Sequence, residues 1–405
     1  TRRGGRFALA PARTSRTLRQ RPCLPPMSPS GHTLALAFVK TFSPGTFSTM
    51  FPAQALQPRN MTRDPPRSNE RTVTMVDVAR HARVSVATVS RVLNTPERVA
   101  PDKSAAVREA VRELEFRPNL AGRTLRAART RTLGVVLPTL SHPVFAECLH
   151  GIEVSARERG YSISIATTGY EPAQEHQASE MLLQRRVDAM VLTVADARHS
   201  RVLDKLDAEA VPYVLVYNQL GRTHSRRSTV SVDNRVAARQ MVEHLIGLGH
   251  RRILMLAGNV RQSDRSRQRV QGYGDAMRAA GLTPLAPIEL AFMAPDATAH
   301  LGNAIRSDAP TALFCSSDQL ALLAIRDLAA LGLAVPADIS VAGFDGTSLS
   351  ALMVPPLTTV VQPSIALGRA AVERVIALLD GARIAQPTVL THELRLGATA
   401  APPRP

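Results

Sequence analysis

The sequence predicts a small all-α domain followed by a larger α/β core, and three observations lead to this fold class. Residues 72-117 show short helical segments joined by tight turns. From Thr132 onward, apolar runs alternate with amphipathic helical stretches, which is typical of a parallel sheet covered by helices on both faces. The 405 residues are enough for two domains with sizeable cores.

The leading segment differs from the rest of the chain. Residues 1 to 60 contain no Asp or Glu but nine Lys and Arg, which is about half of the formal net charge of +17. Residues 1-70 are rich in Arg, Pro, Ser and Thr and lack hydrophobic periodicity, so we expect a disordered or spurious N-terminal extension with Met61 as the translation start. The excess positive charge favours polyanionic partners such as nucleic acid.

Several function classes are disfavoured by what the sequence lacks. It shows no nucleophile–base set and no phosphate-cradling glycine loop, so we expect no enzyme and no cofactor. Cys23, Cys148 and Cys315 lie far apart, without metal-ligand spacing or a paired framework, which favours a reducing, cytoplasmic compartment without a bound metal. No apolar run is long enough for a membrane helix, so no membrane association is expected.

The first two helices of the small domain are predicted to form a helix-turn-helix. The first helix spans Met75 to Ala82, and a turn follows at Arg83-Val84. Ser85 is a good N-cap for a second helix from Val86 to Leu93. Two helices joined by so short a turn place the second helix for reading the DNA major groove. A third helix is expected over Asp102 to Glu115.

The stretch from Val76 to Asn94 closely resembles the headpiece of the lactose repressor (LacI/GalR) family, as does Phe116-Arg-Pro-Asn119 after the third helix. The resemblance implies a repressor of transcription that binds double-stranded operator DNA at the bacterial nucleoid. It implies base contacts in the major groove from Val86, Ala87 and Arg91. Phosphate or supporting contacts are implied for Ser85, Thr88, Ser90, Asn94 and Asn119.

Some positions depart from the family pattern. Arg83 stands where the family usually has Gly, which would strain the turn if the residue has a positive φ. Ala100 replaces the Ser that caps the third helix, so we expect Asp102 to cap it instead.

Residues 118-130 are interpreted as the hinge that the family folds into a helix on operator DNA. Leu125 matches the leucine that wedges into the minor groove, and Gly122 replaces an Ala that favours the helix. An ordinary basic linker is the alternative, because the arginines of this stretch would bind phosphates without sequence preference.

Residues 131-405 resemble the two-lobed periplasmic-binding-protein-like (type I) core that the family uses for effector binding and dimerisation. The resemblance implies a first lobe of about 131-232 and 362-388 and a second lobe of about 233-361 and 389-405. A small-molecule effector would bind in the cleft between them. The family pattern places four effector-binding residues there: Phe145, Arg269, Ser317 and Asp345.

Plainer interpretations remain open for this region. Phe145 could be ordinary core, Asp345 could cap a turn, and Asp318 is expected to cap the helix that starts at Gln319. Arg261, Arg265 and Arg267 are expected to lie in a solvated loop.

Within the family, the stretches 137–153 and 169–172 most resemble gluconate-utilisation repressors. A sugar acid such as gluconate, or its phosphate, is therefore the expected effector, with a neutral sugar or a nucleobase as the alternative. A solute-binding protein would share the core but not the headpiece. A homodimer is expected, because the Pro-rich end of the chain does not resemble the leucine-repeat helix of the family's tetramers.

Overall fold

The computed structural model describes residues 73–116, 129–220, 227–292, 294, 296–383 and 386–404. The expectations for residues 1-70 and for most of the hinge, 118-130, fall outside these described residues. Among the helices that are described, none is long and apolar enough to cross a membrane.

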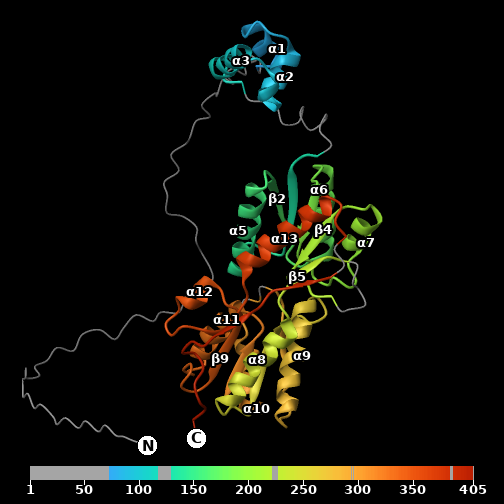
Figure 1. Ribbon diagram of the computed structural model, residues 1–405. Helices are drawn as coiled ribbons and strands as arrows, with labels where there is room; N and C mark the ends of the chain where they lie inside the picture. The colour runs from blue at the N-terminus through green and yellow to red at the C-terminus, as the bar shows by residue number, and fades with distance from the viewer. Residues whose placement is uncertain are drawn as a thin grey trace, which may run out of the picture. The chain divides into compact units, whose positions relative to one another are not determined.

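The headpiece has the predicted all-α fold (Figure 1). Helix α1 (Met75–His81) begins with a capping box, in which Thr74 and Asp77 satisfy each other's backbone N–H groups. Helix α2 (Val86–Asn94) is followed by the short 3-10 helix η1 (Pro96–Arg98) and by α3 (Pro101–Glu113). A small apolar core holds these helices together: Val78, Ala79, Val89, Val92, Val107, Ala110 and Phe116.

Two details of the headpiece concern positions where the sequence departs from the family pattern. Arg83 has a φ of 53°, so a side chain occupies the left-handed turn where glycine is preferred. The expectation that Asp102 caps α3 is wrong. Pro101 starts the helix one residue earlier, so Asp102 lies inside the first turn and Ala100 is the N-cap residue without a side-chain cap.

The first lobe of the core is built on a parallel sheet with strand order β11-β5-β4-β3-β1-β2. Apolar residues on one face of the sheet pack against α5 (Pro143–Glu158) and α13 (Ser364–Leu379). The other face packs against α6 (Pro172–Gln184) and α7 (Arg201–Ala208). The strands are β1 (Thr132–Leu137), β2 (Ser162–Thr167), β3 (Ala189–Leu192), β4 (Tyr213–Val216), β5 (Thr229–Ser231) and β11 (Thr388–Val389).

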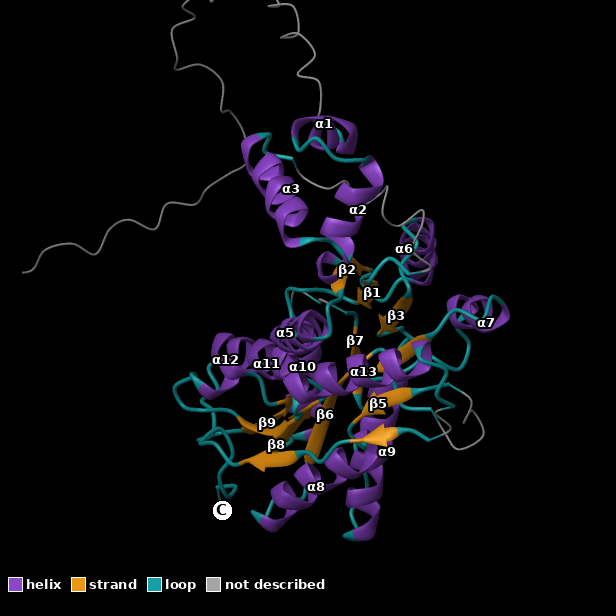
Figure 2. Cartoon of the chain, turned by 45° about the horizontal axis from the view of Figure 1, so that its top comes forward, coloured by secondary structure: helices purple, strands orange, loops and turns teal. Residues whose placement is uncertain are grey.

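The second lobe repeats this plan with strand order β12-β10-β9-β8-β6-β7, in which only β12 is antiparallel among the described pairings. Helices α8 (Asn234–Gly247) and α9 (Asp264–Ala279) cover one face of this sheet (Figure 2). Helices α10 (Thr298–Asp308) and α11 (Asp318–Ala330) cover the other. The remaining elements are β6 (Ile253–Gly258), β7 (Ile288–Leu290), β8 (Ala312–Cys315), β9 (Ser340–Asp345), α12 (Ser348–Ala351), β10 (Thr358–Val361) and β12 (Glu393–Arg395).

The lobes exchange segments of chain. Helix α13 and strand β11 follow the second lobe in sequence but pack in the first, and Figure 1 shows the red α13 against the green α5. Helices α5 and α13 approach each other closely because each carries a glycine at the contact. A Cβ on Gly151 would lie 2.1 Å from the Ile365 carbonyl oxygen, and one on Gly368 would lie 2.2 Å from that of Cys148. Any larger side chain at either position would push the helices apart.

Candidate functional site

The exposed face of α2 carries the predicted DNA-reading residues. Ser85 is the N-cap of this helix, because its side-chain oxygen accepts a hydrogen bond from the Thr88 backbone N–H at 3.1 Å. Val89 and Val92 point into the headpiece core and fix which side of the helix faces outward. The outward and flanking positions are partly or fully exposed: Ser85, Val86, Ala87, Thr88, Ser90, Arg91 and Asn94.

The polar side chains of this face are held in place by one another. The hydroxyls of Ser85 and Thr88 lie 2.9 Å apart, and Asn94 donates its amide to the Ser90 carbonyl at 2.8 Å. Within the described part of the chain, no residue forms a hydrogen bond or ion pair with the guanidinium of Arg91. Arg91 is therefore free to bind a base edge or a phosphate, with five donors available. Two further predicted DNA contacts, Asn119 and Leu125, lie outside the described residues.

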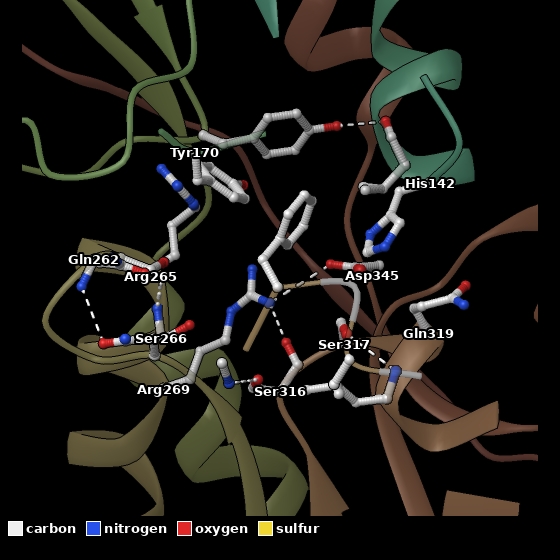
Figure 3. A pocket seen from close by; sticks show the side chains of 18 of the residues that line it. His142, Tyr170, Gln262, Arg265, Ser266, Arg269, Ser316, Ser317, Gln319 and Asp345 are labelled. Carbon is white, nitrogen blue, oxygen red and sulfur yellow. Dashed lines mark hydrogen bonds and ion pairs between the residues drawn. The ribbon is translucent and has the colours of Figure 1, made fainter. Parts of the chain in front are cut away.

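A second candidate site is a cavity of about 170 Å³ in the core, lined by residues from both lobes (Figure 3). The parallel strands explain its position, because ligand sites in such sheets lie at the carboxyl ends of the strands. All four predicted effector-binding residues line it: Phe145, Arg269, Ser317 and Asp345.

Arg269 is the central cation of this cavity. It projects from α9, and its side chain is only 8 % exposed. Its Nε donates to the Asn234 side chain at 2.9 Å, and one terminal nitrogen donates to the Ser316 carbonyl. The same nitrogen lies 3.6 Å from Asp345, and the guanidinium carbon lies 3.6 Å from the centre of the Phe344 ring. These contacts fix a planar set of donors at the cavity wall.

Asp345 is held in an unusual backbone conformation at the end of β9. Its φ is 125°, and its carboxylate accepts a hydrogen bond from the Gln362 amide at 2.9 Å. Burial raises the pKa of the Asp345 carboxyl to about 7, although Arg269 opposes this shift. Burial also lowers the pKa of the Arg269 guanidinium to about 10. Arg269 therefore remains charged near neutral pH. Asp345, in contrast, gains or loses its proton when the pH changes slightly around neutrality.

The opposite side of the cavity is aromatic. Tyr170 of the first lobe lies edge-to-face with Phe292 of the second, with ring centres 4.6 Å apart. Phe145 contacts Tyr217 edge-to-face at 5.6 Å, and His142 lies 5.1 Å from Phe292. Burial lowers the pKa of the His142 ring below its usual range. The cavity thus joins a charged wall to an apolar wall that suits a ring or a carbon chain.

The structure also tests the plainer interpretations of Phe145 and Asp318. Phe145 is 5 % exposed and belongs to the first-lobe core as well as to the cavity wall. The expectation that Asp318 caps the helix is wrong, because the preceding Ser317 is the N-cap of α11. Asp318 instead accepts hydrogen bonds from Thr347 and Ser350, which ties α11 to α12.

The expectation of a solvated loop is wrong for Arg265 and Arg267, because α9 starts at Asp264 and contains both. Arg265 is 5 % exposed and lines the cavity at the lobe boundary, and Arg267 is half-buried beside Asp196. Tyr170 and Phe292 were not singled out. Each follows the carboxyl end of an edge strand, β2 or β7, and this position was the available signal.

A helix-turn-helix headpiece joined to a two-lobed core, with a cavity between the lobes that has a charged and an aromatic wall, defines a ligand-binding regulator of transcription. The family model for bacterial regulatory proteins of the lacI family matches residues 74–119, and the periplasmic binding protein-like domain matches residues 242–399. The chain belongs to the LacI family of DNA-binding transcriptional repressors, and its core is the effector-binding domain of that family.

Individual relatives agree with this assignment. The HTH-type transcriptional repressor CytR of Escherichia coli (strain K12) is 32% identical over 78% of this chain and 91% of its own length. The HTH-type transcriptional regulator GntR of the same strain is 34% identical over 80% of this chain and 96% of its own. The solved lac repressor dimer, bound to operator and the anti-inducer ONPF, has a TM-score of 0.72 at 28% identity, covering 82% of this chain and 100% of that one.

Proposed function

We propose that this repressor responds to a sugar acid, such as gluconate or its phosphate, bound in the interlobe cavity. The observation that supports this proposal is the buried Arg269 beside Asp345, whose raised pKa allows it to become neutral. A ligand carboxylate would then bind the guanidinium without a competing negative charge. Hydroxyls of the ligand would bond to the Ser317 side chain, and its carbon chain would lie on Phe145.

A neutral sugar or a nucleobase is the second candidate, and the aromatic wall supports it. Tyr170 and Phe292 meet edge-to-face in the cavity, and a flat ring would stack well on either of them. A neutral ligand would use Asp345 as an acceptor and leave it paired with Arg269.

A thermal-shift screen of the full chain with D-gluconate, 6-phosphogluconate, D-ribose and cytidine separates the two candidates. A stabilisation by either acid, lost in Arg269→Met, is the expected result. Stabilisation only by ribose or cytidine would replace the sugar acid with the second candidate.

We further propose that Ser85, Val86, Ala87, Thr88, Ser90, Arg91 and Asn94 contact the operator, with Asn119 and Leu125 contributing from beyond the described residues. The exposed side chains on the outward face of α2, Arg91 above all, support this proposal. Selection from a random duplex library by the full chain should return a pseudo-palindromic site, because two headpieces related by a two-fold axis read two half-sites.

The homodimer is also a proposal, and an apolar surface next to α12 supports it. Leu349, Leu352 and Val354 are 50%, 79% and 97% exposed, which is unusual for neighbouring large apolar side chains on a monomer. We propose that a second copy of the chain covers them. Sedimentation at micromolar concentration should show a dimer that Leu352→Glu weakens. A wild-type monomer or tetramer would contradict this proposal.

A further inference from the structure

We propose that Asp264 and Arg265 form a latch that holds the two lobes closed. Both residues lie in the first turn of α9, which belongs to the second lobe. Their partners, Val194, Asn218 and Gln219, follow strands β3 and β4 of the first lobe.

Hydrogen bonds cross the lobe boundary at this point. One carboxylate oxygen of Asp264 accepts from the Asn218 amide at 3.0 Å and from the Gln219 backbone N–H at 3.3 Å. Arg265 donates to the Val194 carbonyl at 3.2 Å. Opening of the lobes would have to break all three of these bonds.

The receiving side of the latch is rigid. Asn218 is fully buried, and its amide exchanges hydrogen bonds with the backbone of Val194 in both directions, at 2.9 and 3.0 Å. Glu175 accepts from the next backbone N–H, that of Ala195, at 2.7 Å. The hydrogen-bond donors and acceptors that the first lobe offers to Asp264 and Arg265 are therefore already held in place.

The pair itself is sealed from solvent. Asp264 and Arg265 lie 3.0 Å apart, with side chains 1% and 6% exposed. The negative charge of Asp264 also lies at the N-terminal end of α9, where the helix dipole stabilises it. Removing either partner would leave the other charge buried without its ion-pair partner, which is unfavourable.

The latch is continuous with the cavity. The guanidinium carbon of Arg265 lies 5.2 Å from the centre of the Tyr170 ring (Figure 3). Tyr170 in turn packs on Phe292 in the aromatic wall. Arg265 is therefore a positioning residue, since it holds the lobes together and supports the wall that a ligand would contact. A latch that favours the binding-competent arrangement of the lobes would also raise apparent ligand affinity, because less of the protein is in an arrangement that cannot bind.

Hydrogen–deuterium exchange of the full chain without added ligand tests the latch. Asp264→Asn and Arg265→Gln each remove one charge from the second lobe and leave the first lobe unaltered. We expect about tenfold faster exchange in peptides covering 193–197, 217–220 and 258–266. The matched control is Asp275→Asn, which removes a carboxylate from the same helix that pairs with Arg235 inside the second lobe.

The expected pattern is faster exchange confined to the lobe boundary in both latch variants and absent from the control. Wild-type exchange at the three peptides in folded variants would overturn the proposal. Uniformly faster exchange throughout the core, or loss of the folded core in both variants, would also overturn it, because the pair would then stabilise one lobe and not the junction.

Discussion

The DNA-reading face of α2 and the interlobe cavity are built in opposite ways. The face is continuous in sequence, is exposed, and carries Arg91, whose guanidinium has no partner among the described residues, on a helix fixed by local contacts. The cavity is buried, and its arginines are already bound to protein carboxylates. The face can meet DNA without rearrangement, whereas the cavity must exchange internal contacts for ligand contacts. Binding at the cavity is therefore suited to shifting a conformational equilibrium.

The sharpest test of this contrast is Arg269→Met. Loss of the buried cation should weaken binding of an acidic ligand by ~2–5 kcal/mol, because it also leaves Asp345 without its partner. Operator affinity without ligand should be unchanged, since the headpiece is intact. Operator titration with and without D-gluconate measures both effects. Arg278→Ala, on the exposed end of α9, is the control, and a normal ligand response in Arg269→Met would place the site elsewhere.

Arg91→Ala tests the other half of the comparison. Operator affinity should fall by ~1–3 kcal/mol with relaxed preference at one base pair per half-site, because Arg91 is expected to read a base edge. Affinity for random DNA should change little. Arg112→Ala, on α3 and paired with Glu109, is the matched control. An equal loss for operator and random DNA would show that Arg91 contacts only phosphate.

The pH dependence of ligand binding distinguishes an acid from a neutral effector. Between about pH 8 and about pH 6, Asp345 gains a proton, because its pKa is raised to about 7. A ligand carboxylate should then bind about tenfold more tightly at the lower pH, since Arg269 loses its competitor. Isothermal titration at both values measures this change, and Asp345→Asn should remove it. Tighter binding at the higher pH would mean that the ionised carboxylate accepts ligand hydroxyls.

The smallest effects are expected at Ser85, where two substitutions distinguish its role as a helix N-cap from its role as a DNA contact. Ser85→Ala should lower the stability of α2 by about 1 kcal/mol through loss of the N-cap. Ser85→Asp keeps a cap acceptor but adds a negative charge toward the phosphates. Thermal unfolding should therefore detect only the Ala variant, and operator titration should detect the Asp variant more strongly. Unchanged operator affinity in Ser85→Asp would remove Ser85 from the DNA contacts.

The same contrast explains what the sequence could and could not predict. The helix-turn-helix, its Ser85 cap and the parallel strands were predictable because each depends on a local pattern of apolar and capping residues. Arg269 and Asp345 were placed by family resemblance, but their mutual contact joins segments 76 positions apart in the chain (345 − 269). No local sequence pattern predicts a contact between residues so far apart in the chain.

The errors have physical causes. The sequence suggests that Arg265 is solvated because its neighbours Arg261 and Arg267 are polar. Its burial is possible because the adjacent residue, Asp264, is a charge partner. Asp318 and Ser317 both suit a cap. Asp318 instead accepts hydrogen bonds from Ser350 of α12 and from Thr347, the N-cap of α12, which lie far from it in sequence.

The exchange of segments between the lobes has a consequence for synthesis. The chain passes from the first sheet to the second after β5, returns after β10, and crosses again between β11 and β12. During synthesis the first lobe therefore emerges without α13, and the apolar surface of α5 stays uncovered until the second lobe has emerged as far as β10. Neither half can mature alone during translation, so a late-closing intermediate with exposed apolar helix surface is the stage at which chaperones would act.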